Sequence, residues 1–355
     1  MTKIRVLVVE DSATVREHLC AVLRSDPDLE VVGEAGDGKR AIALCQELRP
    51  DVITMDMMLP MMSGLAATEY IMAHCPTPIL IVSSSVNRGE LFKAYEALSA
   101  GAVDLMEKPS GDEPDGRWEE KFLSSLKMVA RIHVITHPRA RLNPSSDIAR
   151  FASAPPRRIG KRPYEVLAIG ASTGGPGAIV DVLRGLPSTF SLPVLLVLHI
   201  GEPFGSAFAD WLDGQTSRRV SYARDNQPVD DAVGRVVMAP PGYHLAVQGS
   251  KVHLTLGPER HSCRPSVDVL FESVALEYGA SAAACLLTGM GRDGALGLAA
   301  IRHGGGLTIA QDEATSVVWG MPREAILLGV VDHVLPLSEI GPALSTLVRS
   351  RVGGK

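Results

Sequence analysis

The stretch Val166-Leu-Ala-Ile-Gly-Ala-Ser-Thr-Gly-Gly-Pro-Gly177 decides the fold of the second half of the chain. Its apolar run Val166–Ile169 is typical of a buried strand, and Pro176 marks the first turn of a helix. The glycines between them predict a sharp turn that carries Ser172. A strand that turns directly into a helix is the repeating unit of a parallel α/β sheet. A serine in this place lies among free backbone N–H groups, which stabilise an alkoxide or an oxyanion.

The same alternation continues toward the C-terminus. The predicted strands are Val166–Ile169, Pro193–Leu198, Arg235–Met238, Lys251–Leu256, Ala282–Leu287, Leu307–Ala310 and Val330–Val334. The predicted helices are Pro176–Leu183, Phe204–Trp211, Val267–Leu276, Asp293–Arg302 and a segment around Arg323–Leu327. This pattern predicts a doubly wound, mostly parallel sheet with helices between its strands.

Three loops of this half end in reactive side chains. Ser172 follows the first predicted strand, His199 follows the second, and Asp293 lies in a glycine-rich loop after Ala282–Leu287. Because functional groups of a parallel sheet gather at the carboxyl ends of its strands, we expect the three to meet. A histidine makes a serine nucleophilic by taking its proton, and an acid holds the resulting imidazolium.

Each of these residues also has a simpler interpretation. The Gly-x-Ser-x-Gly pattern around Ser172 is suited to helix capping or phosphate binding, and it half-matches a dinucleotide fingerprint. Asp293 is suited to an N-cap. His244 and His261 compete with His199 for the role of base. From the residues alone, these alternatives stay open.

The first 110 residues show a similar alternation. The predicted strands are Ile4–Val9, Val31–Glu34, Asp51–Met55, Pro78–Val82 and Val103–Met106. Three predicted helices, Ala13–Leu23, Arg40–Leu48 and Ala66–Ala73, lie between them. This half is therefore predicted to form a second doubly wound, mostly parallel sheet.

Polar residues close these strands at one edge. Glu10 and Asp11 follow the first strand, Asp56 the third, Ser83 the fourth and Lys108 the fifth. Three carboxylates repel one another unless a divalent cation joins them, and oxygen ligands suit Mg²⁺. An aspartate beside such a cation can attack a phosphoryl group, with the lysine and the hydroxyl stabilising the charge. We therefore predict a Mg²⁺ site formed by Glu10, Asp11 and Asp56.

The composition excludes several classes of protein. The length of 355 residues predicts two domains, or three, and a content of 46% hydrophobic and 21% charged residues is typical of a soluble globular protein. We predict domains at 1–125 and 163–350, joined by a linker at 126–162. The formal charge of −5 argues against a nucleic-acid or membrane-surface binder. Neither a transmembrane helix nor a signal peptide is predicted. Five scattered cysteines without CxxC spacing predict reduced thiols in the cytoplasm and no zinc site: Cys20, Cys45, Cys75, Cys263 and Cys285.

The predicted linker concentrates positive charge. Residues 131–162 hold eight lysines and arginines against the single acid Asp147, a net charge of +7, together with four prolines. A solvated tether is the simpler interpretation. The alternative is a segment that binds an acidic partner or the acidic remainder of the chain.

Residues 1–125 resemble a response-regulator receiver domain. The resemblance makes Asp56 the phosphorylated aspartate, Glu10 and Asp11 the acidic pair, Ser83 the hydroxyl and Lys108 the lysine. It also implies a histidine kinase as the phosphodonor.

Two positions depart from the common receiver pattern. Pro60 and Gly64 fit the family's loop after the aspartate, whereas Glu10 stands where many receivers carry Asp. Leu105 stands where many receivers carry an aromatic switch residue, so the signalling mode of that switch is open.

The second half resembles the catalytic domain of the chemotaxis protein-glutamate methylesterases, which also carry a receiver. The resemblance rests on Gly170-Ala-Ser-Thr-Gly-Gly175, His199, Arg264-Pro-Ser-Val-Asp268, Thr288-Gly-Met-Gly-Arg-Asp-Gly294 and Gly320-Met-Pro-Arg-Glu-Ala325. It implies that Ser172 is the nucleophile, His199 the base and Asp293 the orienting acid. Thr173 and Met290 lie in loops that it expects to help build the oxyanion site.

The resemblance also implies a function. It predicts phosphorylation-activated hydrolysis of glutamate γ-methyl esters on chemoreceptors, deamidation of receptor glutamines, and no cofactor for the esterase chemistry. Leu198 and Cys263 stand where the family often carries Gln and His, which leaves the fine substrate specificity open.

Three other functions are weighed against this one. A general α/β-hydrolase usually has the chain order serine, acid, histidine, whereas the order here is Ser172, His199, Asp293. A receiver fused to an inert interaction module, in which Ser172 only caps a helix, is a second alternative. A DNA-binding regulator is disfavoured, because the second half has its own alternating sheet and no basic recognition helix.

Overall fold

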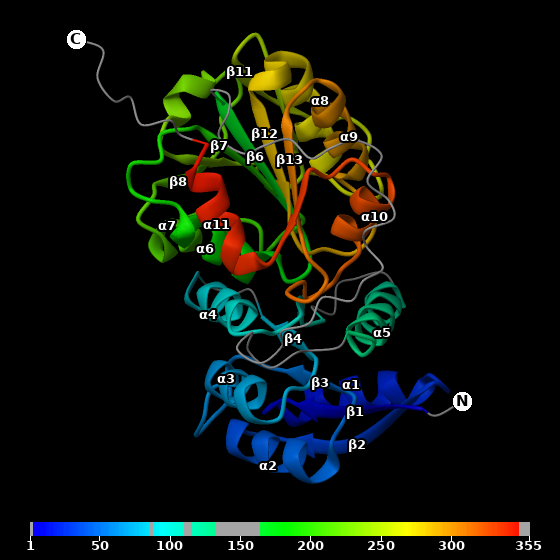
Figure 1. The fold of residues 1–355 in the computed structure, drawn as a ribbon. Coiled ribbons are helices and arrows are strands. Elements are labelled where there is room, and N and C mark those ends of the chain that lie inside the picture. Colours follow the sequence, from blue (N-terminus) through cyan, green and yellow to red (C-terminus); the bar gives the residue numbers. More distant parts are fainter. Residues whose placement is uncertain (1–2, 85–87, 110–115, 133–163, 348–355) are drawn as a thin grey trace, which may run out of the picture. The chain divides into compact units, whose positions relative to one another are not determined.

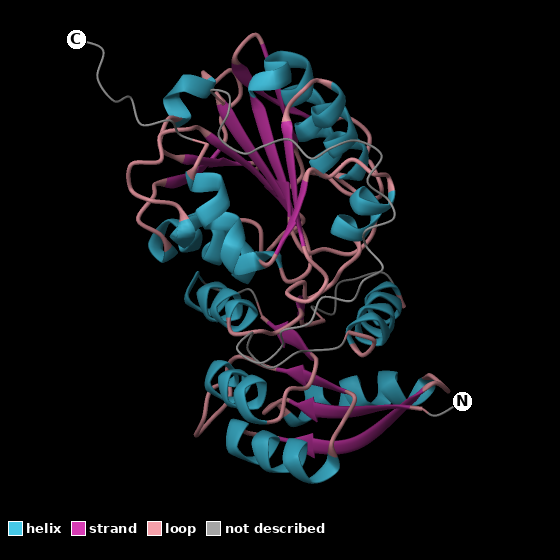
Figure 2. Ribbon diagram, in the orientation of Figure 1, coloured by secondary structure: helices cyan, strands magenta, loops and turns pink. Residues whose placement is uncertain are grey.

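The computed structural model describes residues 3–84, 88–109, 116–132 and 164–347 (Figure 1). The chain divides into two compact units, Met1–Arg141 and Leu142–Lys355. Each is built from strands and helices that alternate along the chain, as Figure 2 shows. Among the described residues, no helix has the length and apolar character needed to cross a membrane.

The first unit is a five-stranded parallel sheet with helices on both faces. Its strands are β1 (Ile4–Val9), β2 (Leu29–Ala35), β3 (Val52–Met55), β4 (Ile79–Ser83) and β5 (Asp104–Glu107). Its helices are α1 (Ala13–Ser25), α2 (Gly38–Leu48), α3 (Gly64–His74), α4 (Arg88–Ser99) and α5 (Arg117–Val129). The strand order is β2-β1-β3-β4-β5, and all pairs are parallel. The predicted doubly wound fold is confirmed, with α4 and α5 added to the three predicted helices.

Local sequence explains why the helices begin where they do. The side chains of Ser12, Asp37 and Ser63 accept hydrogen bonds from backbone N–H groups in the first turns of α1, α2 and α3. Such caps satisfy donors that the helix itself cannot pair. The inner strands β1, β3 and β4 are mostly apolar and buried, which is typical of a sheet covered on both faces, whereas the edge strands β2 and β5 are largely half-buried.

The second unit contains a seven-stranded parallel sheet and a separate hairpin. Its strands are β6 (Val166–Ala171), β7 (Val194–Leu198), β8 (Val220–Tyr222), β9 (Val236–Met238), β10 (His244–Gln248), β11 (Lys251–Thr255), β12 (Ala282–Leu286), β13 (Leu307–Gln311) and β14 (His333–Leu335). Its α-helices are α6 (Gly175–Gly185), α7 (Phe208–Gln215), α8 (Val267–Tyr278), α9 (Ala295–His303), α10 (Met321–Leu327) and α11 (Leu337–Ser345). The sheet order is β14-β13-β12-β6-β7-β9-β8.

Two expectations for this unit need correction. The predicted strand Lys251–Leu256 does not join the parallel sheet, because β11 pairs antiparallel with the unpredicted β10. The turn between them is Gly249-Ser250, and both residues have a positive φ, near 57° and 56°, which suits a tight hairpin. Helix α7 begins at Phe208 rather than at Phe204, because the residues before it form separate turns.

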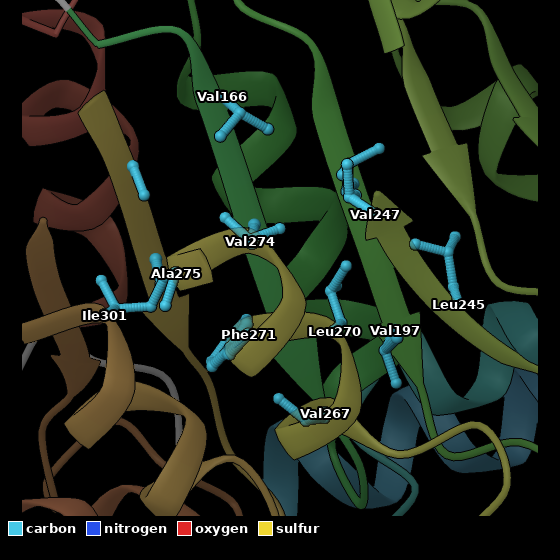
Figure 3. Packing of buried hydrophobic residues seen from close by; sticks show 14 of the residues in the cluster. Val166, Val197, Leu245, Val247, Val267, Leu270, Phe271, Val274, Ala275 and Ile301 are labelled. Carbon is cyan, nitrogen blue, oxygen red and sulfur yellow. The ribbon is translucent and has the colours of Figure 1, made fainter. Parts of the chain in front are cut away.

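The core of the second unit lies between the sheet and α8. Figure 3 shows Val267, Leu270 and Phe271 along α8, in the same buried cluster as Val166 of β6, which lies at the opposite end of the view from Val267. All four side chains are fully buried, and each contributes on the order of 1.5–3 kcal/mol to folding. The first turn of α8 lies against the carboxyl end of β6, since a Cβ on Gly170 would lie 2.2 Å from the Val267 side chain.

The predicted domain limits stay a prediction. Helix α5 continues to Val129, past the predicted receiver end at residue 125. The predicted linker from residue 133 onward, with most of its basic residues, lies outside the described residues.

Candidate active site and phosphorylation site

Strand register brings the three predicted reactive loops of the second unit to one edge of the sheet. Ala171, the last residue of β6, pairs with Leu198, the last of β7, and the amide of His199 donates to Ala171 O at 3.0 Å. On the other side of β6, the amide of Ser172 donates to Thr288 O at 3.0 Å. Ser172 therefore lies between the His199 loop and the glycine-rich loop that carries Asp293.

A hydrogen bond joins His199 to Asp293. His199 Nε2 lies 2.8 Å from Asp293 Oδ2, and the acid is buried. The same carboxylate accepts hydrogen bonds from the amides of Val267 and Asp268, at 2.6 and 3.1 Å, and from the Ser266 hydroxyl at 2.8 Å. These donors form the N-terminus of α8, where a negative charge is favoured.

This cradle keeps Asp293 ionised. Burial raises the pKa of the carboxyl, but the hydrogen bond and the charge of His199 outweigh it, helped by the Asp268 amide and Ser266. The net result is a pKa below the ordinary value. A buried carboxylate with four donors is a fixed negative charge that can orient and stabilise an imidazolium.

The pKa of His199 is raised in turn. Burial lowers it, but the hydrogen bonds and charges of Asp293 and Cys263 outweigh burial and bring the pKa to about 9. Cys263 Sγ lies 3.6 Å from Nδ1, the ring nitrogen that does not face Asp293. At neutral pH the imidazolium is therefore favoured, and the neutral imidazole that a base requires becomes populated on the alkaline side.

The turn that carries Ser172 depends on two glycines. Gly174 has a φ of +75°, and a Cβ there would lie 2.5 Å from the Val317 side chain. A Cβ on Gly289 would lie 2.8 Å from Ser172 Cβ. The serine is half-buried, and its hydroxyl makes no hydrogen bond with any described residue. Its oxygen is therefore not tied to a structural partner.

Thr173 and Met290 lie on the two loops that flank Ser172. Thr288 Oγ1 lies 3.0 Å from Thr173 O and accepts from the Val318 amide, which locks the two loops together. Within the described part of the chain, the amides of Thr173 and Met290 have no protein acceptor. Met290 is also exposed, with 53% of its surface accessible. Both amides are therefore free to donate to a bound group.

The two competing histidines are engaged elsewhere. His244 is buried, and its ring nitrogens pair with the Ser266 amide at 3.1 Å and with Pro258 O at 3.0 Å. His261 pairs with Asp268 at 3.1 Å and accepts from Arg292 Nε at 3.2 Å. Both side chains thus have structural partners at both nitrogens, whereas Nδ1 of His199 has only a thiol beside it.

The two departures from the family pattern have different surroundings. Leu198 is buried and points under the first turn of α6, since a Cβ on Gly175 would lie 2.7 Å from its side chain. Cys263 instead contacts His199. Ser266 donates a hydrogen bond to Asp293 and belongs to the Arg264–Asp268 motif. Its sequence position indicates an N-cap of α8 but not its contact with Asp293.

In the first unit, the predicted phospho-acceptor cluster also meets at one edge. Asp56 follows β3 and is buried, and its Oδ2 atom lies 3.0 Å from Lys108 Nζ. Lys108 also lies 3.0 and 2.8 Å from the two carboxylate oxygens of Glu10. Burial lowers the pKa of Lys108, but the hydrogen bond to Glu10 and the charge of Asp56 outweigh it and raise the pKa. The lysine is therefore a permanent cation between two acids.

The donor set in this cluster fits Mg²⁺. One oxygen each from Glu10, Asp11 and Asp56 lies within 4.8 Å of the others. Asp56 Oδ1 and the Ser83 hydroxyl are buried without a hydrogen-bond partner among the described residues. Burial, together with the charge of Asp56, raises the pKa of Glu10 despite Lys108. Buried carboxylate oxygens without partners are what a hard divalent cation requires.

Two parallel α/β units, one with an aspartate–lysine cluster and one with a serine, a histidine and an acid, define a receiver-linked hydrolase. The family model described as CheB methylesterase matches residues 167–344, and the response regulator receiver domain model matches residues 6–114. The chain belongs to the CheB methylesterase family and carries a receiver domain, so the predicted membership is confirmed.

Relatives cover nearly the whole chain. A protein-glutamate methylesterase/protein-glutamine glutaminase of Anaeromyxobacter dehalogenans is 43% identical over 346 residues, which cover 98% of this chain and 97% of that protein. Its counterpart in Nitrosospira multiformis is 41% identical over 353 residues, covering 98% of each. The crystal structure of the Thermotoga maritima CheB methylesterase catalytic domain has a TM-score of 0.50 at 35% identity, and it covers 53% of this chain and 100% of that one.

Proposed function

We propose that this chain hydrolyses γ-methyl esters of glutamate side chains on chemoreceptors and deamidates receptor glutamines, with Ser172 as the nucleophile. The observation that carries the proposal is the buried carboxylate of Asp293, held 2.8 Å from His199 at the sheet edge where Ser172 lies. The names of the two relatives support the substrate class. The activity serves sensory adaptation in chemotaxis.

Acylation follows from the orientation of His199. Because Nε2 donates to Asp293, Nδ1 is the nitrogen that takes the proton of the Ser172 hydroxyl. Ser172 Oγ then attacks the ester carbonyl carbon, and the amides of Thr173 and Met290 stabilise the oxyanion. The tetrahedral intermediate collapses when the carbon–oxygen bond to the methoxy group breaks. His199 returns its proton to that oxygen, and methanol leaves.

Deacylation repeats these steps with water. Neutral His199 takes a proton from a water molecule, whose oxygen attacks the acyl carbon. The bond to Ser172 Oγ breaks, the serine regains its proton from His199, and the glutamate carboxylate is released. With a glutamine side chain, ammonia replaces methanol as the leaving group, and the acyl-enzyme is the same.

The receiver controls this chemistry through Asp56. Glu10, Asp11 and Asp56 would hold Mg²⁺, which when bound supplies positive charge to offset that of the incoming phosphoryl group. A carboxylate oxygen of Asp56 accepts the phosphoryl group of a histidine kinase. Lys108 and Ser83 stabilise the added oxygens. Phosphorylation increases activity by favouring the active state of the enzyme over the inactive one.

The cellular setting is part of the same proposal. The five cysteines are free thiols, which fits a reducing compartment such as the cytoplasm. The formal charge of −5 gives no support to nucleic-acid binding.

Methanol release from methylated receptor membranes tests the proposal. We expect Mg²⁺ and a small phosphodonor to stimulate release by wild type and by the matched control Ser221→Ala, an exposed serine on β8. Release should be lost in Ser172→Ala, and donor stimulation should be lost in Asp56→Asn. Undiminished release by Ser172→Ala would place the nucleophile elsewhere. Rapid hydrolysis of simple aryl esters with no release from receptors would favour a general hydrolase.

A further inference from the structure

The Cys263 thiol and the His199 imidazole are two potential metal ligands that lie side by side, and the proposed esterase chemistry does not use the thiol. Cys263 Sγ lies 3.6 Å from His199 Nδ1, although 64 residues separate them in sequence. A carboxylate oxygen of Asp293 completes a group in which one ligand atom from each residue lies within 4.8 Å of the others. The cysteine spacing alone does not predict a metal site here, since its partner is a distant histidine.

The distances suit a tetrahedral soft cation. Zinc lies about 2.3 Å from a thiolate and about 2.0–2.1 Å from an imidazole nitrogen. Two such ligands at a tetrahedral angle are about 3.5 Å apart, close to the 3.6 Å between Sγ and Nδ1. Asp293 pairs with the opposite nitrogen, Nε2, at 2.8 Å. A carboxylate behind the imidazole is the usual outer partner of a zinc-bound histidine.

The outer partner is itself held in place. Asp293 accepts hydrogen bonds from the Val267 and Asp268 amides and from Ser266, so its position does not depend on His199. In the neutral form of the imidazole, the remaining proton is therefore held on Nε2 toward Asp293, and the Nδ1 lone pair faces the thiol. Ligands fixed in this way lose little freedom when a metal binds.

We propose that His199 Nδ1 and Cys263 Sγ bind Zn²⁺ and that the bound ion inhibits the esterase. Binding releases the thiol proton of Cys263 and, at neutral pH, also the Nδ1 proton of the imidazolium, so that the metal occupies the Nδ1 lone pair. That lone pair is the one that must accept the serine proton, so the zinc-bound histidine cannot act as a base. The inhibition rests on the proposed role of His199, whereas the binding does not.

Neighbouring candidate ligands are less suited to zinc. His261 and Asp268 lie 3.1 Å apart, but Arg292 donates to the other nitrogen of His261 and Arg260 lies 3.8 Å from Asp268. Two arginines therefore stand where a second cation would have to bind.

In the first unit, the Cys45 and Cys75 thiols lie 3.6 Å apart. Burial and the neighbouring thiol raise the pKa of Cys75 to about 12, which opposes the thiolate that zinc requires.

Cobalt substitution tests binding without any esterase assay. Full-length protein is titrated with Co²⁺ in millimolar Mg²⁺, and a sulfur-to-cobalt charge-transfer band reports a thiolate ligand. We expect one equivalent to produce the band in wild type, in the matched control Cys75→Ser, and in the esterase-dead Ser172→Ala. The band should be absent in Cys263→Ser. Zn²⁺ should displace the cobalt. A full band in Cys263→Ser, or none in wild type, would overturn the site.

Inhibition is measured as methanol release in buffered Zn²⁺, with each variant compared with its own zinc-free rate. We expect a chelator to reverse the inhibition of wild type. Half-maximal inhibition of Cys263→Ser should need more than about 100-fold more zinc than that of wild type. Loss of an outer partner typically lowers metal affinity by only about 10–100-fold, so a larger change indicates loss of a direct ligand. Cys263→His keeps a ligand and should stay zinc-sensitive. Equal zinc sensitivity in Cys263→Ser would contradict the proposal. Cobalt binding with unaffected release would keep the metal site and reject the proposed base role of His199.

Discussion

Replacing Asp293 by asparagine separates the electrostatic role of this residue from its size. Both oxygens of the carboxylate face donors: Oδ2 accepts from His199 and the Val267 amide, and Oδ1 accepts from Ser266 and the Asp268 amide. An asparagine must turn its NH₂ group toward one of these pairs. Either orientation leaves one main-chain N–H of α8 facing another donor, in a buried place.

The effects on stability and on catalysis differ in size. An unpaired buried N–H costs about 1–3 kcal/mol, and losing a negative charge at a helix N-terminus costs about 0.3–2 kcal/mol. We therefore expect Asp293→Asn to lower the free energy of unfolding by about 2–4 kcal/mol. If the NH₂ group faces His199, the ring proton moves to Nδ1, which can then no longer accept from Ser172. The same change of tautomer lowers kcat about 10⁴-fold in a serine protease triad.

Methanol release and urea unfolding measure the two effects on the same protein samples. The exposed Asp231→Asn serves as the control, with both quantities expected to stay near wild type. The folded pKa of Asp293 lies below its unfolded value, so its charge stabilises the protein above about pH 3.8. The stability difference between wild type and Asp293→Asn should therefore shrink as the pH falls through the folded pKa. A loss in kcat of less than tenfold would refute the role assigned to Asp293.

Three further predictions follow from the site geometry. In zinc-free buffer, kcat should rise with pH through about 9 as His199 loses its proton, and Cys263→Ser should move this limb to lower pH. A pH–rate profile with no such limb would contradict the raised pKa. Gly174→Ala, at a φ of +75° and against Val317, should lower the free energy of urea unfolding by at least about 1–2 kcal/mol. Lys108→Met should slow acyl phosphate formation from a small phosphodonor about 10²-fold, and an unchanged rate would show that its charge is dispensable.

The fold was predictable because both sheets are parallel and buried. The predicted strand Ile4–Val9 coincides with β1, and the predicted strand Val166–Ile169 lies within β6 (Val166–Ala171), since a strand covered on both faces needs mostly apolar residues. The hairpin of β10 and β11 was not predicted as such, because its strands have no periodicity that separates them from parallel ones. Its turn, Gly249-Ser250, indicates a reversal of the chain but not which strands pair.

The sequence by itself determined which residues stand at strand ends, and hence that Ser172, His199 and Asp293 share one edge. Parallel strands place their carboxyl ends together whatever the details of packing. Only the tertiary structure decided that Nε2 of His199 faces Asp293, that the first turn of α8 holds this acid, and that Cys263 lies 3.6 Å from Nδ1. These contacts join loops that are far apart in the sequence. Their geometry depends on side-chain rotamers and helix packing, which local periodicity does not encode.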